Sequence, residues 1–114
     1  MAKVRYMIEY LADPKKSAAG EIEYLPCGVW AVSDSQFEIG ILKEKFPERA
    51  EEIHWFINYL VERDIRPHQD PEFLEYWRDS RSAYKGMFSE IAETDEFTSA
   101  VNCVNAMLER LRGL

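Results

Sequence analysis

The spacing of apolar residues changes along the chain, from a repeat of two near the start to repeats of three and four later. Residues 3–11 alternate between two faces. One of these faces carries Val4, Tyr6, Ile8 and Tyr10. Residues 21–25 alternate again, and residues 29–32 form a short apolar run after a turn. A period of two rich in β-branched and aromatic residues predicts two or three antiparallel strands, and the Pro, Gly and small polar residues at 12–20 predict an exposed loop.

The segment 34–46 fits two structures equally well. Ser35 followed by Glu38 resembles the capping box that begins a helix, whereas alternation at Phe37, Ile39 and Ile41 is typical of a strand. Gly40 weakens both interpretations because glycine disfavours helix and strand interiors. Strand and helix therefore both stay open for this segment.

Residues 47–64 predict a helix with an apolar stripe along one side. Pro47 suits the first helical position, and Glu48 follows where the helix dipole favours negative charge. Apolar residues recur at intervals of three and four and fall within about 140° of arc. The stripe comprises Ile53, Phe56, Ile57, Leu60 and Val61. We expect it to face the core, and Pro67 to prevent the helix from continuing.

Two further apolar seams have the alternating four-and-three spacing of helices that pack along a narrow stripe. The first comprises Phe73, Trp77, Ser80, Tyr84, Met87 and Ile91, and the second comprises Phe97, Val101, Val104, Leu108 and Leu111. Asp70 suits the N-cap of a helix over residues 71–92, and Thr94 or Asp95 suits that of the final helix. The gap from Ile91 to Phe97 turns the second seam roughly 240° from the first, so we expect a break and an antiparallel hairpin. Alternatively, one seam pairs with a second copy and forms a homodimer.

These elements predict an α+β fold. A small N-terminal antiparallel β-sheet of two to four strands is covered by three C-terminal α-helices, of which the last two form an antiparallel hairpin. The length of 114 residues fits one domain. Within it we expect a β-rich part at 1–33, the ambiguous segment at 34–46 and a helical part at 47–114.

The charge of the chain limits its possible partners. The formal net charge is −7, and residues 34–114 carry the whole excess, with seventeen acidic against ten basic residues. Direct nucleic-acid binding needs the opposite balance, because Lys and Arg neutralise the phosphates. The acidic surface instead favours a basic protein as partner, or simply keeps the protein soluble. No apolar run approaches the roughly 18 residues that span a bilayer, and we expect a cytoplasmic protein with no membrane partner.

Recognisable catalytic and cofactor motifs are absent from the sequence. It contains no phosphate-binding glycine loop, zinc-protease motif or calcium loop. Cys27, Cys103, His54 and His68 have no compact metal-ligand spacing, and whether the two cysteines approach each other stays open. We therefore predict no catalytic residue, no cofactor and no metal. Whether the protein is an enzyme stays open, and a non-enzymatic role is favoured.

Trp55 and Tyr59 form a second apolar ridge on the side of the 47–64 helix opposite its core stripe. The polar residues flanking this ridge are Glu48, Glu52, Glu62 and Arg66. Aromatic side chains ringed by charge are typical of interface centres. We nevertheless favour the alternative that the ridge packs against the N-terminal sheet, which would make this helix buried on two sides, although the acidic residues around Trp55 argue against it.

Two functions are compatible with these observations. The first is a non-enzymatic acidic protein that binds a larger, basic protein or nucleoprotein complex as an inhibitor or regulator, such as an immunity-type or anti-defence factor or an accessory subunit. The alternative is a small α+β enzyme or ligand-binding domain with a pocket between sheet and helices. Its pocket would use Tyr6, Tyr10, Tyr24 or Trp30 as walls and Arg5 or His54 as polar groups. Size, acidity and missing motifs favour the first.

Overall fold

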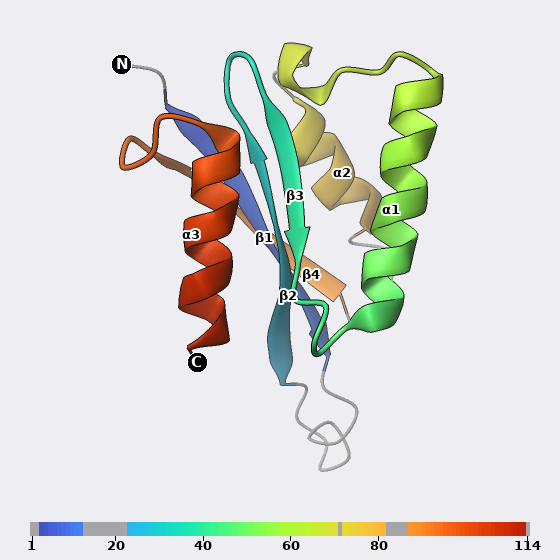
Figure 1. The fold of residues 1–114 in the computed structure, drawn as a ribbon, viewed down its shortest axis with the longest axis vertical. Helices are drawn as coiled ribbons and strands as arrows, with labels where there is room; N and C mark the ends of the chain where they lie inside the picture. Colours follow the sequence, from blue (N-terminus) through green and yellow to red (C-terminus); the bar gives the residue numbers. More distant parts are fainter. Residues whose placement is uncertain (1–2, 13–22, 71, 82–86, 114) are drawn as a thin grey trace.

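The computed structural model describes residues 3–12, 23–70, 72–81 and 87–113. In these residues, four strands form one antiparallel sheet in the order β3-β2-β1-β4 (Figure 1). The strands are β1 (Val4–Ala12), β2 (Tyr24–Val32), β3 (Phe37–Ile41) and β4 (Met87–Thr94). The predicted α+β class and antiparallel sheet are confirmed. Most of the loop predicted at 12–20 lies outside the described residues.

Helices cover both faces of this sheet. They are α1 (Pro47–Glu62), the short 3-10 helix η2 (Pro67–Gln69), α2 (Phe73–Arg81) and α3 (Ala100–Arg112). Figure 1 shows α3 on one side of the sheet and α1 and α2 on the other. Successive strand residues point to opposite faces, so Val29 and Ala31 pack under α3 while Trp30 packs under α1 and α2. None of the helices in the described part is long and apolar enough to cross a membrane.

The predicted helical hairpin is wrong. The helix expected over 71–92 ends at Arg81, and residues 87–94 form β4, which pairs with β1. α2 and α3 therefore pack on opposite faces of the sheet and do not pack against each other's seams. The physical reason is tertiary: Ile91 lies opposite Met7 in the pairing and packs with the core under α1 and α2. Of the first seam, Tyr84 lies outside the described residues.

Local signals predicted several boundaries and missed others. The Asp70 side chain accepts a hydrogen bond from the Glu72 backbone N–H at 3.0 Å, as expected of a cap. The final helix is capped by Ser99, whose side chain accepts from Asn102 N at 3.1 Å. The expectation of Thr94 or Asp95 as its N-cap is therefore wrong. Thr94 instead lies at the end of β4, because residues 87–94 form a strand where the seam predicted a helix.

The ambiguous segment 34–46 contains β3, and the two short strands expected before it form one strand, β2. The pairing register of β1 with β2 shifts between Glu9 and Tyr10, which lie opposite Gly28 and Pro26. Cys27 is therefore an extra residue at a β-bulge, the structure that lets a strand continue through an irregular turn-like sequence.

Gly40 allows α3 to lie directly on β3. A Cβ atom at this position would overlap Leu108 Cδ1 and lie 2.6 Å from Val104 Cγ1. Any larger residue would require the Val104 and Leu108 side chains or α3 itself to shift. The glycine that weakened both sequence interpretations is thus explained by close packing between strand and helix.

Candidate functional site

A buried ion pair holds α1 on the sheet. Arg49 of α1 is 5% exposed, and Glu9 of β1 is fully buried. Arg49 Nε and Nη2 lie 2.7 and 2.6 Å from Glu9 Oε1, and Arg49 Nη1 donates to Glu52 Oε2 at 2.7 Å. One guanidinium thus connects an inner strand to a surface carboxylate of α1. This pair fixes which side of α1 faces the sheet and which side faces outward.

Two more groups surround the Glu9 carboxylate. Trp77 Nε1 donates to Glu9 Oε2 at 3.4 Å, and Cys27 Sγ lies 3.7 Å from Oε1 and donates to the Glu9 backbone oxygen at 3.2 Å. Burial, followed by the Glu9 charge, raises the pKa of the Cys27 thiol to about 12. Because the thiolate is the nucleophilic form of cysteine, Cys27 is a hydrogen-bond donor here and not a reactive group.

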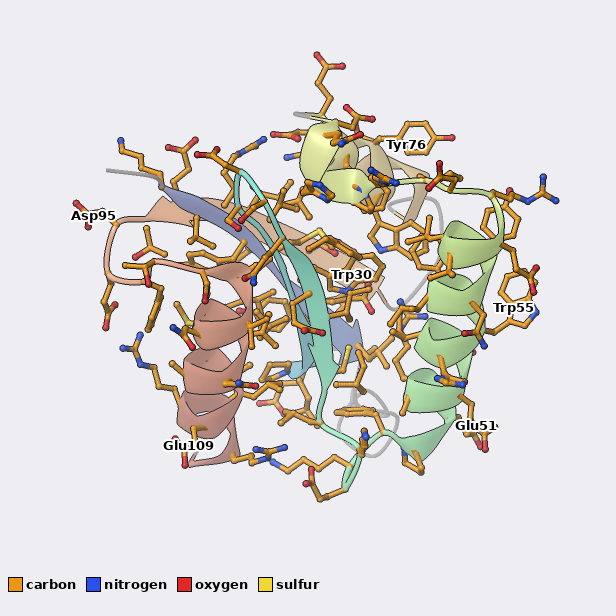
Figure 2. All side chains as sticks on the ribbon, turned by 45° about the horizontal axis from the view of Figure 1, so that its top comes forward. Trp30, Glu51, Trp55, Tyr76, Asp95 and Glu109 are labelled. Carbon is orange, nitrogen blue, oxygen red and sulfur yellow. The ribbon has the colours of Figure 1, made fainter. Side chains whose placement is uncertain are left out.

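The outward side of α1 carries the candidate site, a pair of stacked aromatic rings. Trp55 is 68% exposed, and Figure 2 shows it pointing away from the sheet. Its ring stacks on Tyr59 with centroids 5.9 Å apart and an interplanar angle of 23°. The Arg63 guanidinium lies over the Tyr59 ring, 4.5 Å from its centroid. Trp55 is therefore not a core residue, and its orientation is fixed by neighbours on the helix.

The predicted acidic residues lie around this stack. At 100° per residue, the three predicted glutamates of α1 fall within about 60° of Trp55, and all three are exposed: Glu48, Glu52 and Glu62. Glu52 is also held by Arg49. Arg66 lies beyond the helix end and pairs with Asp64 at 3.3 Å. We call Trp55, Tyr59, Arg63 and these three glutamates the aromatic–acidic face.

Sequence reasoning missed two parts of this arrangement. Val61, expected in the core, is 73% exposed, because the helix is rotated so that Ile53 and Leu60 face inward. The Glu9–Arg49 pair was also missed. A signal for it exists, since Arg49 falls four residues before Ile53 in the core stripe and Glu9 shares a strand face with Met7. Opposite charges at two core-facing positions indicate a buried pair.

The structure separates the cysteines and histidines. Both cysteines are buried, and neither forms a disulfide. Cys27 lies beside Glu9, and Cys103 lies in the core under α3. His54 borders a groove beside β3, and His68 borders a separate cleft at η2. Among the described residues, no three His, Cys, Asp or Glu side chains gather as a metal site.

Of the pocket walls proposed for a ligand-binding domain, Trp30 belongs to the core, whereas Tyr6 and Tyr10 are half-buried and Tyr24 is exposed. Trp30 is fully buried, with its ring 4.6 Å from Trp77 and 5.7 Å from Phe56. Arg5 does border a cleft of about 330 Å³. Its guanidinium, however, already pairs with the carboxylates of Glu75 and Glu93. Of the two polar groups expected to bind a ligand, Arg5 is therefore occupied by intramolecular ion pairs, and His54 borders the groove beside β3.

Comparison with known proteins gives no family assignment. No protein-family model matches the chain, and neither a curated protein nor a solved structure matches it. Functional arguments therefore rest on the geometry of the described residues.

Proposed function

We propose that this protein is a non-enzymatic binding protein whose aromatic–acidic face docks on a basic surface of a larger protein or nucleoprotein complex, as an inhibitor or regulator. The observation that carries the proposal is Trp55, which is 68% exposed yet stacked in a fixed orientation on Tyr59. Transfer of a large apolar ring surface from water into a protein contact is favourable, so covering it contributes strongly to binding.

Preorganisation supports this role. Ordering a side chain on binding costs about 0.5–1.5 kcal/mol for each rotamer-rich residue. The stack of Trp55 on Tyr59, with Arg63 over the second ring, already restricts these side chains in the free protein. Glu52 is likewise held by its 2.7 Å contact with Arg49. Binding therefore orders these side chains less, and more of the free energy gained by covering Trp55 contributes to affinity.

Charge supports a basic partner. The chain has a formal net charge of −7, and exposed glutamates surround Trp55. This concentration of negative charge accelerates diffusional encounter with a basic protein surface and repels acidic surfaces. Screening by salt weakens long-range attraction between exposed charges, so association should slow as ionic strength rises. Contact between the partner and the Trp55 ring should depend far less on salt.

The test uses two pairs of matched variants. The first pair is Trp55→Ala and Tyr76→Ala, because Tyr76 is 72% exposed on α2, away from the aromatic–acidic face. The second pair is Glu62→Lys and Glu109→Lys, which change the net charge equally on α1 and on α3. Each purified variant is immobilised, native extract is passed over it at low salt, and retained proteins are identified and then measured by titration.

We expect one stoichiometric basic partner, retained by wild type, Tyr76→Ala and Glu109→Lys. Trp55→Ala should weaken its binding by about tenfold or more, equivalent to about 1.4 kcal/mol, and Glu62→Lys should mainly slow association. Equal retention by Trp55→Ala and wild type would contradict the proposal. Absence of any stoichiometric partner at low salt would contradict it as well.

A further inference from the structure

β3 lies at an edge of the sheet and borders an open groove. The strand order ends at β3, and Figure 1 shows β3 in front, between α3 and α1. The groove has a volume of about 630 Å³. Its apolar lining residues are Ile39, Ile41, Ala50, Ile53, Ile57 and Leu108. Unpaired strand edges readily add another strand, so natural proteins usually block or cover them.

The hydrogen-bond pattern shows which backbone groups face this groove. Leu42 N donates to Cys27 O at 2.8 Å, and Ser33 N donates to Gln36 O at 2.9 Å. In an antiparallel pair every second residue bonds its neighbour, so the even-numbered residues of β3 bond β2. The backbone groups of Phe37, Ile39 and Ile41 therefore point outward. Consistently, Ile39 N donates to the Glu38 carboxylate at 3.2 Å and not to β2.

We propose that β3 pairs antiparallel with β3 of a second copy, about a two-fold axis at Ile39, and joins the two sheets into one. In this register Ile39 lies opposite its symmetry mate, Phe37 lies opposite Ile41, and Glu38 lies opposite Gly40. Apolar residues thus face apolar residues, and no like charges oppose each other, which is the arrangement that stabilises a pair of strands. The outward N–H groups and the carbonyls of Phe37 and Ile39 find partners, and the Ile41 carbonyl, which already accepts from Lys43 N at 2.9 Å, accepts a second bond.

The exposed side of α1 fits the same symmetry. Ala50, His54, Ile57 and Val61 fall within about 60° of arc at 100° per residue. Three of them border the groove, and Val61 continues the stripe at 73% exposure. A two-fold axis between His54 and Ile57 makes the two α1 helices antiparallel and places Ala50 beside Val61 of the second copy. The exposure of Val61 is thereby explained.

One opposite-charge contact near the ends of β3 fits this register. Lys43 borders the groove beyond the C-terminal end of β3, and pairing places it beside Asp34, which precedes the N-terminal end of β3 in the other copy. Glu44 lies opposite Asp34, but its charge is balanced by Arg112 of its own chain, 3.6 Å away. Such a symmetric contact uses the same patch on both copies. The side-chain register, the α1 stripe and the approach of Lys43 to Asp34 therefore favour a second copy as the occupant.

Glu38 opposes this association in the free protein. Its carboxylate accepts the Ile39 N–H that would otherwise bond the partner strand. Glu38→Ala removes this competing acceptor and should tighten dimerisation. Val61→Arg places a charge in the apolar contact between the two α1 helices and should weaken it. The two variants therefore change the dimer in opposite directions.

The experiment measures the mass of the full chain by sedimentation equilibrium from low-micromolar to near-millimolar concentration. We expect the mass to rise from one chain of 13.4 kDa toward twice that value. Val61→Arg should raise the dimer dissociation constant by about tenfold or more, since symmetry repeats each substitution twice. Tyr76→Arg, at a residue 72% exposed on α2, is the matched control and should change nothing.

Hydrogen exchange locates the contact. The amides of Phe37, Ile39 and Ile41 should exchange more slowly as concentration rises, because each gains a backbone acceptor. A chain that stays monomeric throughout would overturn the proposal, as would a dimer that Val61→Arg leaves intact. Trp55 lies about a third of a turn from the α1 stripe, so Trp55→Ala should dimerise normally. The outcome is therefore independent of the proposed function.

Discussion

Replacing Arg49 by methionine tests the buried ion pair that orients α1. The substitution keeps a long side chain and removes the charge that balances Glu9. The Glu9 carboxylate, which is fully buried, then keeps only the contacts from Trp77 Nε1 at 3.4 Å and Cys27 Sγ at 3.7 Å. Breaking a buried pair from one side typically costs about 3–5 kcal/mol. We expect Arg49→Met to lower the free energy of unfolding by that amount.

The structure also predicts an asymmetry between the two partners. Glu9→Gln leaves an arginine that still contacts Glu52 at 2.7 Å, and Glu52 is largely in solvent. This variant should therefore cost less, about 1–3 kcal/mol. The double variant leaves no unbalanced charge, so its cost should fall below the sum of the single costs by about 2 kcal/mol, within the usual range for contacting residues.

Urea unfolding monitored by tryptophan fluorescence measures these free energies. Glu52→Gln serves as the control, because removing an exposed partner typically changes stability by less than about 1 kcal/mol. Three results would refute the reasoning: a cost below about 1 kcal/mol for Arg49→Met, a Glu9→Gln variant less stable than Arg49→Met, or additive effects in the double variant. If Arg49→Met alone fails to fold while the double variant folds, the cost of losing Arg49 is smaller when Glu9 is neutral, and the two sites are coupled.

Two further predictions concern packing and pH. Gly40→Ala should destabilise the protein by about 1–3 kcal/mol in chemical unfolding, because the added Cβ meets Val104 at 2.6 Å and overlaps Leu108; a neutral effect would show that α3 shifts freely. Burial raises the pKa of the Cys27 thiol in the folded protein from 9.0 to about 12. The neutral thiol therefore contributes its full stabilisation of the fold below pH 9, and this contribution is lost as the pH rises toward about 12. Cys27→Ala should therefore show a shallower loss of stability over that range, and identical slopes would contradict the shift.

The fold was predictable where local and long-range signals agree. β1 alternates over its full length, and α1 begins at Pro47 as its first-turn signals indicate. Residues 87–94 were misassigned because Met87 and Ile91 continue a helical spacing from Phe73 and Trp77. What makes this segment a strand is its pairing with β1, far away in the sequence. Strand preference depends strongly on such context, and a window of neighbouring residues does not contain it.

The sequence predicts which residues share one side of α1, but it does not predict whether that side is exposed to solvent. The helical spacing placed Trp55 and Tyr59 on one side of α1, which the structure confirms through their stacking. Whether that side faces the sheet or the solvent depends on how α1 is rotated. Arg49 contacts Glu9 in the observed rotation, in which Ile53 also packs into the core, and these contacts join two elements whose relation no local pattern encodes. The groove beside β3 likewise appears only once the strand order is known.

The position of β1 has a consequence for how the chain folds during synthesis. Of the described strands, β1 is made before the other three, yet it lies inside the sheet and pairs with residues 87–94, and the face under α3 stays uncovered until residues 100–112 are made. A nascent chain that ends before β4 thus exposes an unpaired strand edge and one apolar face, both of which promote aggregation. The sheet should therefore be completed late, by contacts between β1 and residues 87–112, and their wide separation in sequence raises contact order and slows folding.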